Sequence, residues 1–228
     1  MNDALLYAGR RVIVTGAASG LGAATAEILV DLGAEVHAID INKPEVTGLA
    51  SFTPADLREP AQIDDAVAKI GTVVNALFNC AGLPSTFPPL DVMLVNFCGL
   101  RQLTEAVIPL MIEGSSIASI ASTAGTGWMQ NLELLLDLLR TPDFAGARAW
   151  CAEHPTELTN SYGLSKEAIN AYTALRSFDL AAEGIRINCV NPGPTDTAGP
   201  AWPLIFLNSP RASSVTGQRL DLDGLGDA

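Results

Sequence analysis

The feature that most constrains the fold is a short apolar segment, Val12-Ile-Val-Thr15, that runs directly into a glycine-rich turn, Gly16-Ala-Ala-Ser-Gly-Leu-Gly22. Strand-like and helix-like segments alternate after this turn, and such alternation predicts parallel βαβ units. The sequence therefore predicts an α/β fold with a doubly wound parallel sheet. Strands are expected at Arg11–Thr15, Glu35–Asp40, Val73–Asn79, Ser116–Ala121 and Arg186–Val190, and helices at Gly20–Leu32, Pro60–Ile70, Asp91–Met111 and Ser165–Ala182.

The bulk properties fit a single domain over residues 1–228. No repeat or low-complexity tract interrupts the chain, and its hydrophobic fraction of 48% is enough for one buried core. The apolar runs are too short to cross a bilayer, and the N-terminal residues lack a secretory signal pattern. The net charge of −12 argues against nucleic-acid binding, which needs a basic surface. We expect a cytoplasmic protein without a membrane or nucleic-acid partner.

The cysteines and histidines argue against a metal centre. Cys80, Cys98, Cys151 and Cys189 lie too far apart for a Cys-x-x-Cys site, and His37 and His154 are the only histidines. A zinc-dependent alcohol dehydrogenase is therefore not expected, and the thiols are expected to be reduced. We interpret Cys80 as a small buried residue and not as a reactive thiol.

The glycine turn predicts a dinucleotide site in a Rossmann-like domain. Its glycines let the backbone approach a pyrophosphate, and the N–H groups that open the next helix supply donors. Asp40 ends the second strand, where a carboxylate would bind ribose hydroxyls and repel a 2′-phosphate. Lys43 is the sole nearby cation that could favour NADP. We predict NAD(H) as the cofactor; the alternative is a purely structural turn. The residues assigned here are Gly16, Ala18, Ser19, Gly20, Leu21, Gly22, Asp40 and Ile41.

A tyrosine and a lysine four residues apart, Tyr162 and Lys166, predict acid–base chemistry. A free tyrosine has a pKa of about 10, so it is almost never ionised at neutral pH. An ammonium group one helical turn away lies on the same helix face and favours the phenolate. The alternative is an ordinary pair on a helix surface. With a dinucleotide site upstream, the pair suggests hydride transfer on an alcohol or ketone.

These motifs together resemble the short-chain dehydrogenase/reductase family. The resemblance rests on Thr15-Gly-x-x-x-Gly-x-Gly22, Asn79-Cys-Ala-Gly82, Asn96, Ala121-Ser122-Thr, Tyr162-x-x-x-Lys166 and Pro192-Gly-Pro-Thr-Asp-Thr197, which occur in family order over nearly the whole chain. It implies Tyr162 as the acid/base and Lys166 as its pKa modulator and ribose ligand. It implies Ser122 as the donor to the substrate oxygen, with Ser119 as the alternative, and Asn96 as the holder of a water in a proton relay.

The same resemblance implies further cofactor contacts. Asp56 and Leu57 resemble the pair that contacts adenine, the segment Asn79, Cys80, Ala81 and Gly82 resembles the cofactor-lining turn, and Pro192, Gly193, Thr195 and Thr197 resemble the nicotinamide-side loop. Plain structural roles are the alternatives: a helix cap or kink for Asn96, a helix N-terminal charge for Asp56, and turn positions for Thr195 and Thr197.

Three departures from the family pattern indicate which subgroup of the family the chain resembles. The crossover from Asp40 to Asp56 is too short for a full helix, and the link from Gly82 to the helix with Asn96 is abbreviated. Conversely, an insertion over residues 123–161 precedes the tyrosine helix, and we predict two helices in it, Asn131–Arg140 and Phe144–Glu153. This combination is similar to the bacterial 3α-hydroxysteroid dehydrogenase/carbonyl reductase group and to coniferyl-alcohol dehydrogenases. The apolar insertion could wall a bulky substrate site, pack on a partner subunit, or cover the main core.

A fourth departure follows Thr197. The chain passes almost directly to Ala201–Ser209, which resembles the last helix of the family, and then to Val215–Gly224, which resembles the closing strand and its loop. About thirty residues that form a substrate lid in relatives have no counterpart, either because they are deleted or because the given sequence omits them.

Taken together, the sequence predicts an NAD(H)-dependent oxidoreductase acting on a bulky apolar secondary alcohol or ketone such as a hydroxysteroid. An aryl-alcohol dehydrogenase and a non-catalytic NAD-binding scaffold with an open cleft are the alternatives. An NADPH-dependent reductase of acyl-carrier ketones is disfavoured by Asp40. From the family resemblance we also expect a homodimer or homotetramer.

Overall fold

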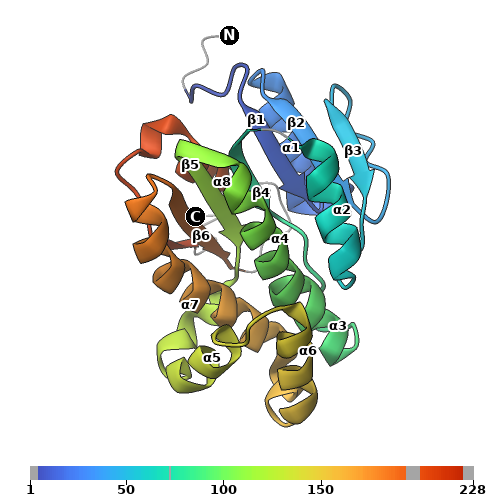
Figure 1. Cartoon of the computed structure of the whole chain (residues 1–228), viewed down its shortest axis with the longest axis vertical. Helices are drawn as coiled ribbons and strands as arrows, with labels where there is room; N and C mark the ends of the chain where they lie inside the picture. The colour runs from blue at the N-terminus through green and yellow to red at the C-terminus, as the bar shows by residue number, and fades with distance from the viewer. Residues whose placement is uncertain (1–4, 72, 194–200, 223–228) are drawn as a thin grey trace, which may run out of the picture.

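The computed structural model describes residues 5–71, 73–193 and 201–222. In this part of the chain, seven strands form one parallel sheet in the order β3-β2-β1-β4-β5-β6-β7. The predicted α/β fold with a Rossmann-like parallel sheet is thus confirmed (Figure 1). The strands are β1 (Arg11–Thr15), β2 (Glu35–Asp40), β3 (Ser51–Pro54), β4 (Val74–Asn79), β5 (Met111–Ile120), β6 (Arg186–Pro192) and β7 (Arg219–Leu222).

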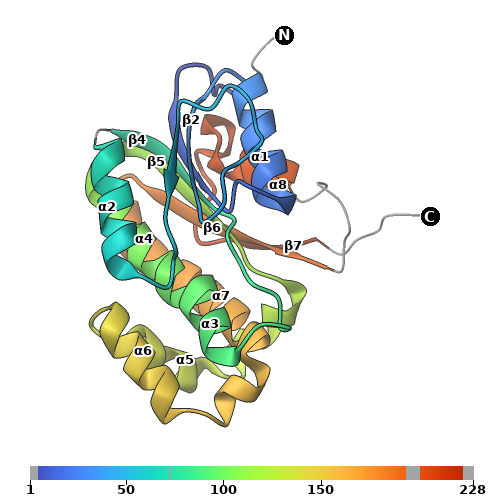
Figure 2. The same cartoon turned by 90° about the vertical axis from the view of Figure 1, so that its right-hand side faces the viewer.

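Helices cover both faces of the sheet, as Figure 2 shows. One face carries α1 (Gly20–Asp31) and α8 (Ala201–Asn208), and the other carries α2 (Pro60–Ile70), α4 (Leu100–Val107) and α7 (Ser161–Ala182). The remaining helices are α3 (Pro89–Met93), α5 (Leu132–Leu139) and α6 (Phe144–Glu153), with a π-helical segment η1 (Leu94–Gly99) and 3₁₀ segments η2 (Ile108–Leu110), η3 (Thr123–Met129), η4 (Glu157–Asn160) and η5 (Pro210–Ala212).

The sheet is buried on both faces because its central strands carry apolar side chains on each face. Alternate side chains point to opposite faces of a strand, so β1 sends Ile13 to one side and Val12 and Val14 to the other. Ile13 pairs in register with Leu77 of β4, and Leu77 pairs with Ile117 of β5. These three side chains are fully buried beneath α2, α4 and α7. Continuous burial of this kind is typical of parallel sheets.

Several boundaries differ from the sequence prediction. α7 begins at Ser161, four residues before the predicted start, because the side chain of Asn160 accepts a hydrogen bond from the N–H of Gly163 at 3.3 Å. The helix predicted over Asp91–Met111 is instead the succession α3, η1, α4 and η2. Strand β5 begins at Met111, with a register shift against β4. Strand β3 was not predicted, whereas the expected lack of a helix between Asp40 and Asp56 is confirmed.

Helices α5 and α6 occur in the predicted places and lie together at the end of the molecule below α7 (Figures 1 and 2). Their inward residues, which include Leu135, Leu138 and Trp150, belong to the same apolar cluster as Ile13 and Ile117. A buried arginine of α4, Arg101, holds this pair of helices in place. Its guanidinium donates to the carbonyls of Leu138 and Leu139 at 3.4 Å, to the carbonyl of Asp143 at 2.9 Å and to the hydroxyl of Thr141 at 3.0 Å.

Among the described residues, no helix combines the length and the apolar character needed to cross a membrane.

Candidate active site

A cleft of about 660 Å³ lies at the carboxyl ends of the strands. Chain order reverses between β1 and β4, and in open parallel sheets such a switch point is where ligands bind. One side of the cleft is formed by residues that follow β2 and β3, and the other by residues from β4, β5, β6 and α7. The site therefore has two unlike halves joined across the turn after β1.

The glycine turn lies at the centre of the cleft and leaves no room for side chains at two positions. A Cβ at Gly22 would lie 2.0 Å from the carbonyl oxygen of Gly16, and a Cβ at Gly16 would lie 2.7 Å from Cα of Ala81. Gly20 has a φ of +53° and open space around it. No side chain caps the N-terminus of α1 at Ser19, so the first N–H groups of this helix face the cleft without a side-chain partner.

Asp40 stabilises the glycine turn as well as lining the cleft. Its Oδ2 accepts from the backbone N–H of Ala18 at 2.9 Å, and its Oδ1 accepts from that of Asn42 at 2.9 Å. Ala18 itself is not among the lining residues; its contribution is this hydrogen bond. The hydrogen bond to Ala18 thus fixes the Asp40 carboxylate, at the end of β2, relative to the glycine turn after β1.

Thr15 joins the turns that follow β1 and β4. Its hydroxyl accepts from the N–H groups of Cys80 at 3.0 Å and Ala81 at 3.1 Å. Sequence reasoning gave Thr15 no role of its own, although its place at the end of a central strand was a usable signal. Burial of its thiol raises the pKa of Cys80 to about 12, which agrees with the interpretation of an unreactive thiol, but the residue is half-buried and lines the cleft instead of being fully buried as expected.

Asn79 lies behind the cleft and does not line it. Its Nδ2 donates to the hydroxyls of Thr104 at 3.0 Å and Ser119 at 3.2 Å. These bonds tie the end of β4 to β5 and α4 in the buried interior. Ser119 is therefore turned inward, and of the two candidate serines it is Ser122 that lines the cleft.

Tyr162 and Lys166 project into the cleft from the first turns of α7. The Nζ atom of Lys166 lies 5.6 Å from the ring centroid of Tyr162 and donates to the carbonyl of Ile120 at 2.9 Å. Burial lowers the pKa of Lys166 to about 8. A lysine that is still mostly protonated at neutral pH thus lies beside the ring of Tyr162.

Ser122 completes this half of the cleft. It follows β5 and caps segment η3, with its hydroxyl accepting from the N–H of Ala124 at 3.2 Å. Segment η3 packs tightly along α7, since a Cβ at Gly125 would lie 2.5 Å from the carbonyl carbon of Lys166. This packing fixes Ser122 relative to the helix that carries Tyr162 and Lys166.

Asn96 lies in the π-helical segment and holds the wall of the cleft. Its Oδ1 accepts from the N–H of Leu83 at 2.7 Å, and its Nδ2 donates to the carbonyl of Leu83 at 3.0 Å and to Ser165 Oγ at 3.2 Å. Ser165 in turn donates to the carbonyl of Tyr162 at 2.7 Å. Both polar atoms of the Asn96 side chain thus bind protein groups, and Asn96 is not itself a lining residue.

At the other end of the cleft, Asp56 is paired with Arg58. The guanidinium donates from Nε and Nη2 to the Asp56 carboxylate, at 2.7 Å for the closest pair of atoms, and from Nη1 to Asp91 at 3.0 Å. The hydrogen bonds from Arg58 hold the pKa of Asp56 below its ordinary value. Sequence reasoning missed Arg58, because its second partner lies 33 residues farther along the chain.

The structure brings together most of the predicted site. The predicted residues that line the cleft are Gly16, Ser19, Gly20, Leu21, Gly22, Asp40, Ile41, Asp56, Leu57, Cys80, Ala81, Gly82, Ser122, Tyr162, Lys166, Pro192 and Gly193. Ala18, Asn79 and Asn96 support these residues from outside the lining. Thr195 and Thr197 lie outside the described residues. The lining residues that were not predicted are Ile39, Asn42, Ala55, Arg58, Leu83, Pro84, Phe87, Val95, Ile120 and Ala121.

Comparisons with known proteins identify the family of this chain. The family profile described as short chain dehydrogenase matches residues 10–132, and one described as enoyl-(acyl carrier protein) reductase matches residues 148–201. The chain belongs to the short-chain dehydrogenase family. It is therefore an oxidoreductase that acts on alcohols or ketones as small-molecule substrates and uses a nicotinamide cofactor.

Among its relatives, the chain is 35% identical to a coniferyl-alcohol dehydrogenase of Pseudomonas over 189 residues, covering 82% of this chain and 74% of that protein. It is 31% identical to a 3-alpha-hydroxysteroid dehydrogenase/carbonyl reductase of Comamonas testosteroni, covering 95% and 96% of the two chains. The crystal structure of a 3-alpha-hydroxysteroid dehydrogenase from Pseudomonas in complex with NADH superposes with a TM-score of 0.77 at 28% identity, covering 96% of each chain.

Proposed function

We propose that this protein is an NAD(H)-dependent dehydrogenase or reductase of a bulky apolar secondary alcohol or ketone. The proposal rests on how the candidate catalytic and cofactor-binding residues are distributed in one cleft. Tyr162, Lys166 and Ser122 lie in the half formed by β4, β5, β6 and α7, while Asp40 lies in the other half, beside the glycine turn. A dinucleotide that spans the switch point would place its reactive ring in the first half and its adenosine in the second.

The residues present fit a dinucleotide. The turn at Gly16 and Gly22 admits no side chain, Gly20 opens onto free space, and the N-terminus of α1 offers uncapped N–H donors to a pyrophosphate. Asp40 and Lys166 then offer an acceptor and a donor to the two riboses. The nicotinamide, when bound, supplies the acceptor or donor of a hydride.

The charges around the adenosine half favour NAD(H) over NADP(H). Asp40 repels an added phosphate, and the cleft-lining cations among the described residues are Arg58 and Lys166. Arg58 is already bound by Asp56 and Asp91, while Lys166 lies in the opposite half. The adenosine half therefore offers no unpaired cation, among the described lining residues, to a 2′-phosphate.

The proton chemistry follows from the three side chains. Tyr162 would exchange the hydroxyl proton of the substrate, Ser122 would donate a hydrogen bond to the developing alkoxide, and Lys166 would stabilise the phenolate of Tyr162 by its charge. The bond from Lys166 to the carbonyl of Ile120 holds the ammonium in place for this role. Asn96 would act as a positioning residue, because its carboxamide ties Leu83 to the Ser165–Tyr162 turn.

The substrate half of the cleft has an apolar wall. It consists of Leu83, Pro84, Phe87 and Val95, and Phe87 is 46% exposed at the mouth. Such a wall suits a hydroxysteroid, as the Comamonas and Pseudomonas relatives named for that substrate also suggest. A coniferyl-type aryl alcohol is the second candidate, favoured by the relative at 35% identity.

We also propose that the domain carries the insertion at 123–161 and lacks the usual lid after 197. In support, the two family profiles leave residues 133–147 unmatched. The alignment with the Comamonas enzyme extends over 251 positions, more than the 228 residues of this chain, so that relative has residues without a counterpart here. None of residues 123–161 lines the cleft, which favours the core-covering interpretation of the insertion. The predicted homodimer or homotetramer stays a prediction, to be tested by light scattering.

The decisive experiment follows NADH formation over hydroxysteroid, terpene and aryl alcohols, with NAD and NADP in parallel, for the wild type and Tyr162→Phe. Turnover is expected with NAD and one substrate class, and the variant should lose it while it still binds NADH. A variant that keeps turnover would overturn the mechanism. Tight NADH binding without turnover of any alcohol would instead favour the non-catalytic scaffold.

A further inference from the structure

The Asp56–Arg58–Asp91 bridge is a built feature of the cleft that the proton chemistry does not use. Arg58 binds Asp56 through two of its nitrogens and also donates its backbone N–H to Asp56 Oδ1 at 2.9 Å. The third nitrogen reaches Asp91 in the first turn of α3. The three side chains are 22–39% exposed, so the bridge is neither buried nor freely solvated.

The place of the bridge follows from the order of the strands. Asp40 ends β2, and the next strand outward is β3, after which Ala55, Asp56, Leu57 and Arg58 line the cleft. A dinucleotide with a ribose at Asp40 would therefore extend its base over these residues. The bridge lies at the purine end of the cleft.

The chemistry of the bridge makes Asp56 a fixed acceptor. The hydrogen bonds that Arg58 donates lower the pKa of Asp56 below its ordinary value, which itself lies far below neutral pH, so the carboxylate is ionised and Arg58 fixes its orientation. An ionised carboxylate accepts hydrogen bonds and donates none. Arginine suits this task because its planar fork holds a carboxylate in one orientation, which a lysine would not do. A 6-amino group on the base would be accepted here, whereas an oxygen at the same position would be repelled.

We propose that Arg58, held by Asp91, is a specificity-determining positioning residue that fixes Asp56 as the acceptor for a 6-amino purine. The inference rests on the proposed function, since it requires that a dinucleotide occupy the cleft. It assigns a role to two residues, Arg58 and Asp91, of which Asp91 does not line the cleft at all.

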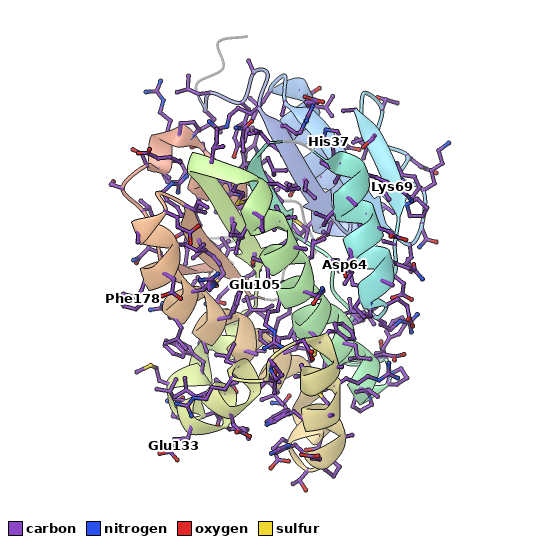
Figure 3. All side chains as sticks on the ribbon, in the orientation of Figure 1. His37, Asp64, Lys69, Glu105, Glu133 and Phe178 are labelled. Carbon is purple, nitrogen blue, oxygen red and sulfur yellow. The ribbon has the colours of Figure 1, made fainter. Side chains whose placement is uncertain are left out.

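The test is the affinity of the purified chain for NADH and for deamino-NADH, in which an oxygen replaces the 6-amino group, measured by nucleotide fluorescence. The wild type should bind NADH at least tenfold more tightly than deamino-NADH, which is about 1.4 kcal/mol. Arg58→Gln should reduce this preference to within threefold, and Asp91→Asn should reduce it at least threefold. The matched control is Arg176→Gln, because Arg176 pairs with Glu105 and Asp179 on the α4–α7 face, where Figure 3 labels Glu105.

The outcomes separate this inference from the proposed function. A wild type that binds both nucleotides equally tightly would overturn the inference and leave the dinucleotide site standing. Full preference in both Arg58→Gln and Asp91→Asn would also overturn it, because Asp56 would then act unaided. Binding of neither nucleotide by the wild type would remove the proposed function itself. If Arg58→Gln fails to fold, Asp91→Asn decides, since it leaves Asp56 and Arg58 in place.

Discussion

The ammonium of Lys166 donates to the backbone carbonyl of Ile120 at 2.9 Å, so that a lysine of helix α7 is anchored to the end of strand β5. The residue is only 5% exposed, and burial lowers its pKa to about 8. The fold therefore holds a charged group in a place that disfavours its charge. This arrangement has a measurable consequence for stability.

We expect Lys166→Met to stabilise the fold at pH 7. A lysine that titrates near 8 when folded and near 10.4 when unfolded costs about 3 kcal/mol below pH 8. Loss of the bond to Ile120 offsets about 1 kcal/mol of that gain. Because the unfolded state binds the proton more tightly, the wild type recovers stability as pH rises from about 8 to about 10.5, and the difference between the two proteins shrinks. Urea unfolding of both proteins at pH 7 and pH 9.5 measures this difference in the free energy of unfolding.

The control for this prediction is Lys69→Met, which removes an exposed lysine at the end of α2 (labelled in Figure 3). Its stability should change by less than about 0.5 kcal/mol at either pH. A Lys166→Met protein that is less stable than the wild type at pH 7 would show that the buried charge is not costly.

The glycine turn should tolerate no side chain at position 22. A Cβ there would lie 2.0 Å from the carbonyl oxygen of Gly16, so Gly22→Ala should lower the unfolding free energy by about 3 kcal/mol or more and weaken NADH binding. Gly9→Ala is the comparison, because Gly9 has a φ of +70° but nothing within 4 Å of its Cβ position. That variant should lose only about 1 kcal/mol from backbone strain. Equal losses in the two variants would contradict the steric explanation.

Asp40→Asn should weaken the discrimination against NADP about tenfold. The change removes the charge that repels a 2′-phosphate, while the amide oxygen can still accept from the N–H of Ala18. Parallel titrations with NADH and NADPH give the ratio of dissociation constants. Asp64→Asn, on the exposed side of α2, makes the same change in net charge outside the cleft and should leave the ratio as it is (Figure 3). An unchanged ratio in Asp40→Asn would remove this residue from cofactor selection.

Arg101→Met should loosen the α5–α6 pair without affecting the cofactor. Its guanidinium is a buried donor to the carbonyls of Leu138, Leu139 and Asp143, and losing these hydrogen bonds should cost about 2–3 kcal/mol in urea unfolding. The NADH affinity should stay within twofold, because no residue of α5 or α6 lines the cleft. Arg140→Met, at the exposed end of α5, should cost less than about 0.5 kcal/mol. A large loss of NADH affinity in Arg101→Met would mean that helices α5 and α6 shape the site.

The sequence predicts the fold best where a local pattern determines the structure. Strands β1 and β2 and helices α2 and α6 have the predicted bounds, because apolar runs, a proline at Pro60 and the turn at Thr141-Pro142 are local signals. Strand β3 was missed because Ser51-Phe-Thr-Pro54 is a short edge strand with little apolar content. Its strand character comes from pairing with β2.

The π-helical segment was not predicted for a different reason. All residues from Leu94 to Gly99 are buried, so their apolar pattern does not distinguish a π-helix from an α-helix. The need for Gly99 arises from the carbonyl of Leu57, which would lie 2.3 Å from a Cβ there. Arg101 and the contact of Arg58 with Asp91 were missed for a similar reason, because these partners lie 33 or more residues away in sequence. Local motifs predicted the candidate reacting groups, whereas the contacts that orient these groups are tertiary.

The carboxamide of Asn96 pairs with both the N–H and the carbonyl of Leu83, as a neighbouring strand would do. The side chain of Asn96 thus supports the backbone of the apolar wall with the kind of hydrogen bonds that a neighbouring strand would form. Pro84 and Phe87 follow this anchored residue along the chain and also line the cleft, but neither is bonded to Asn96. Positions 84 and 87 are therefore the natural place to redesign substrate range by substitution, because the anchor at Leu83 stays intact.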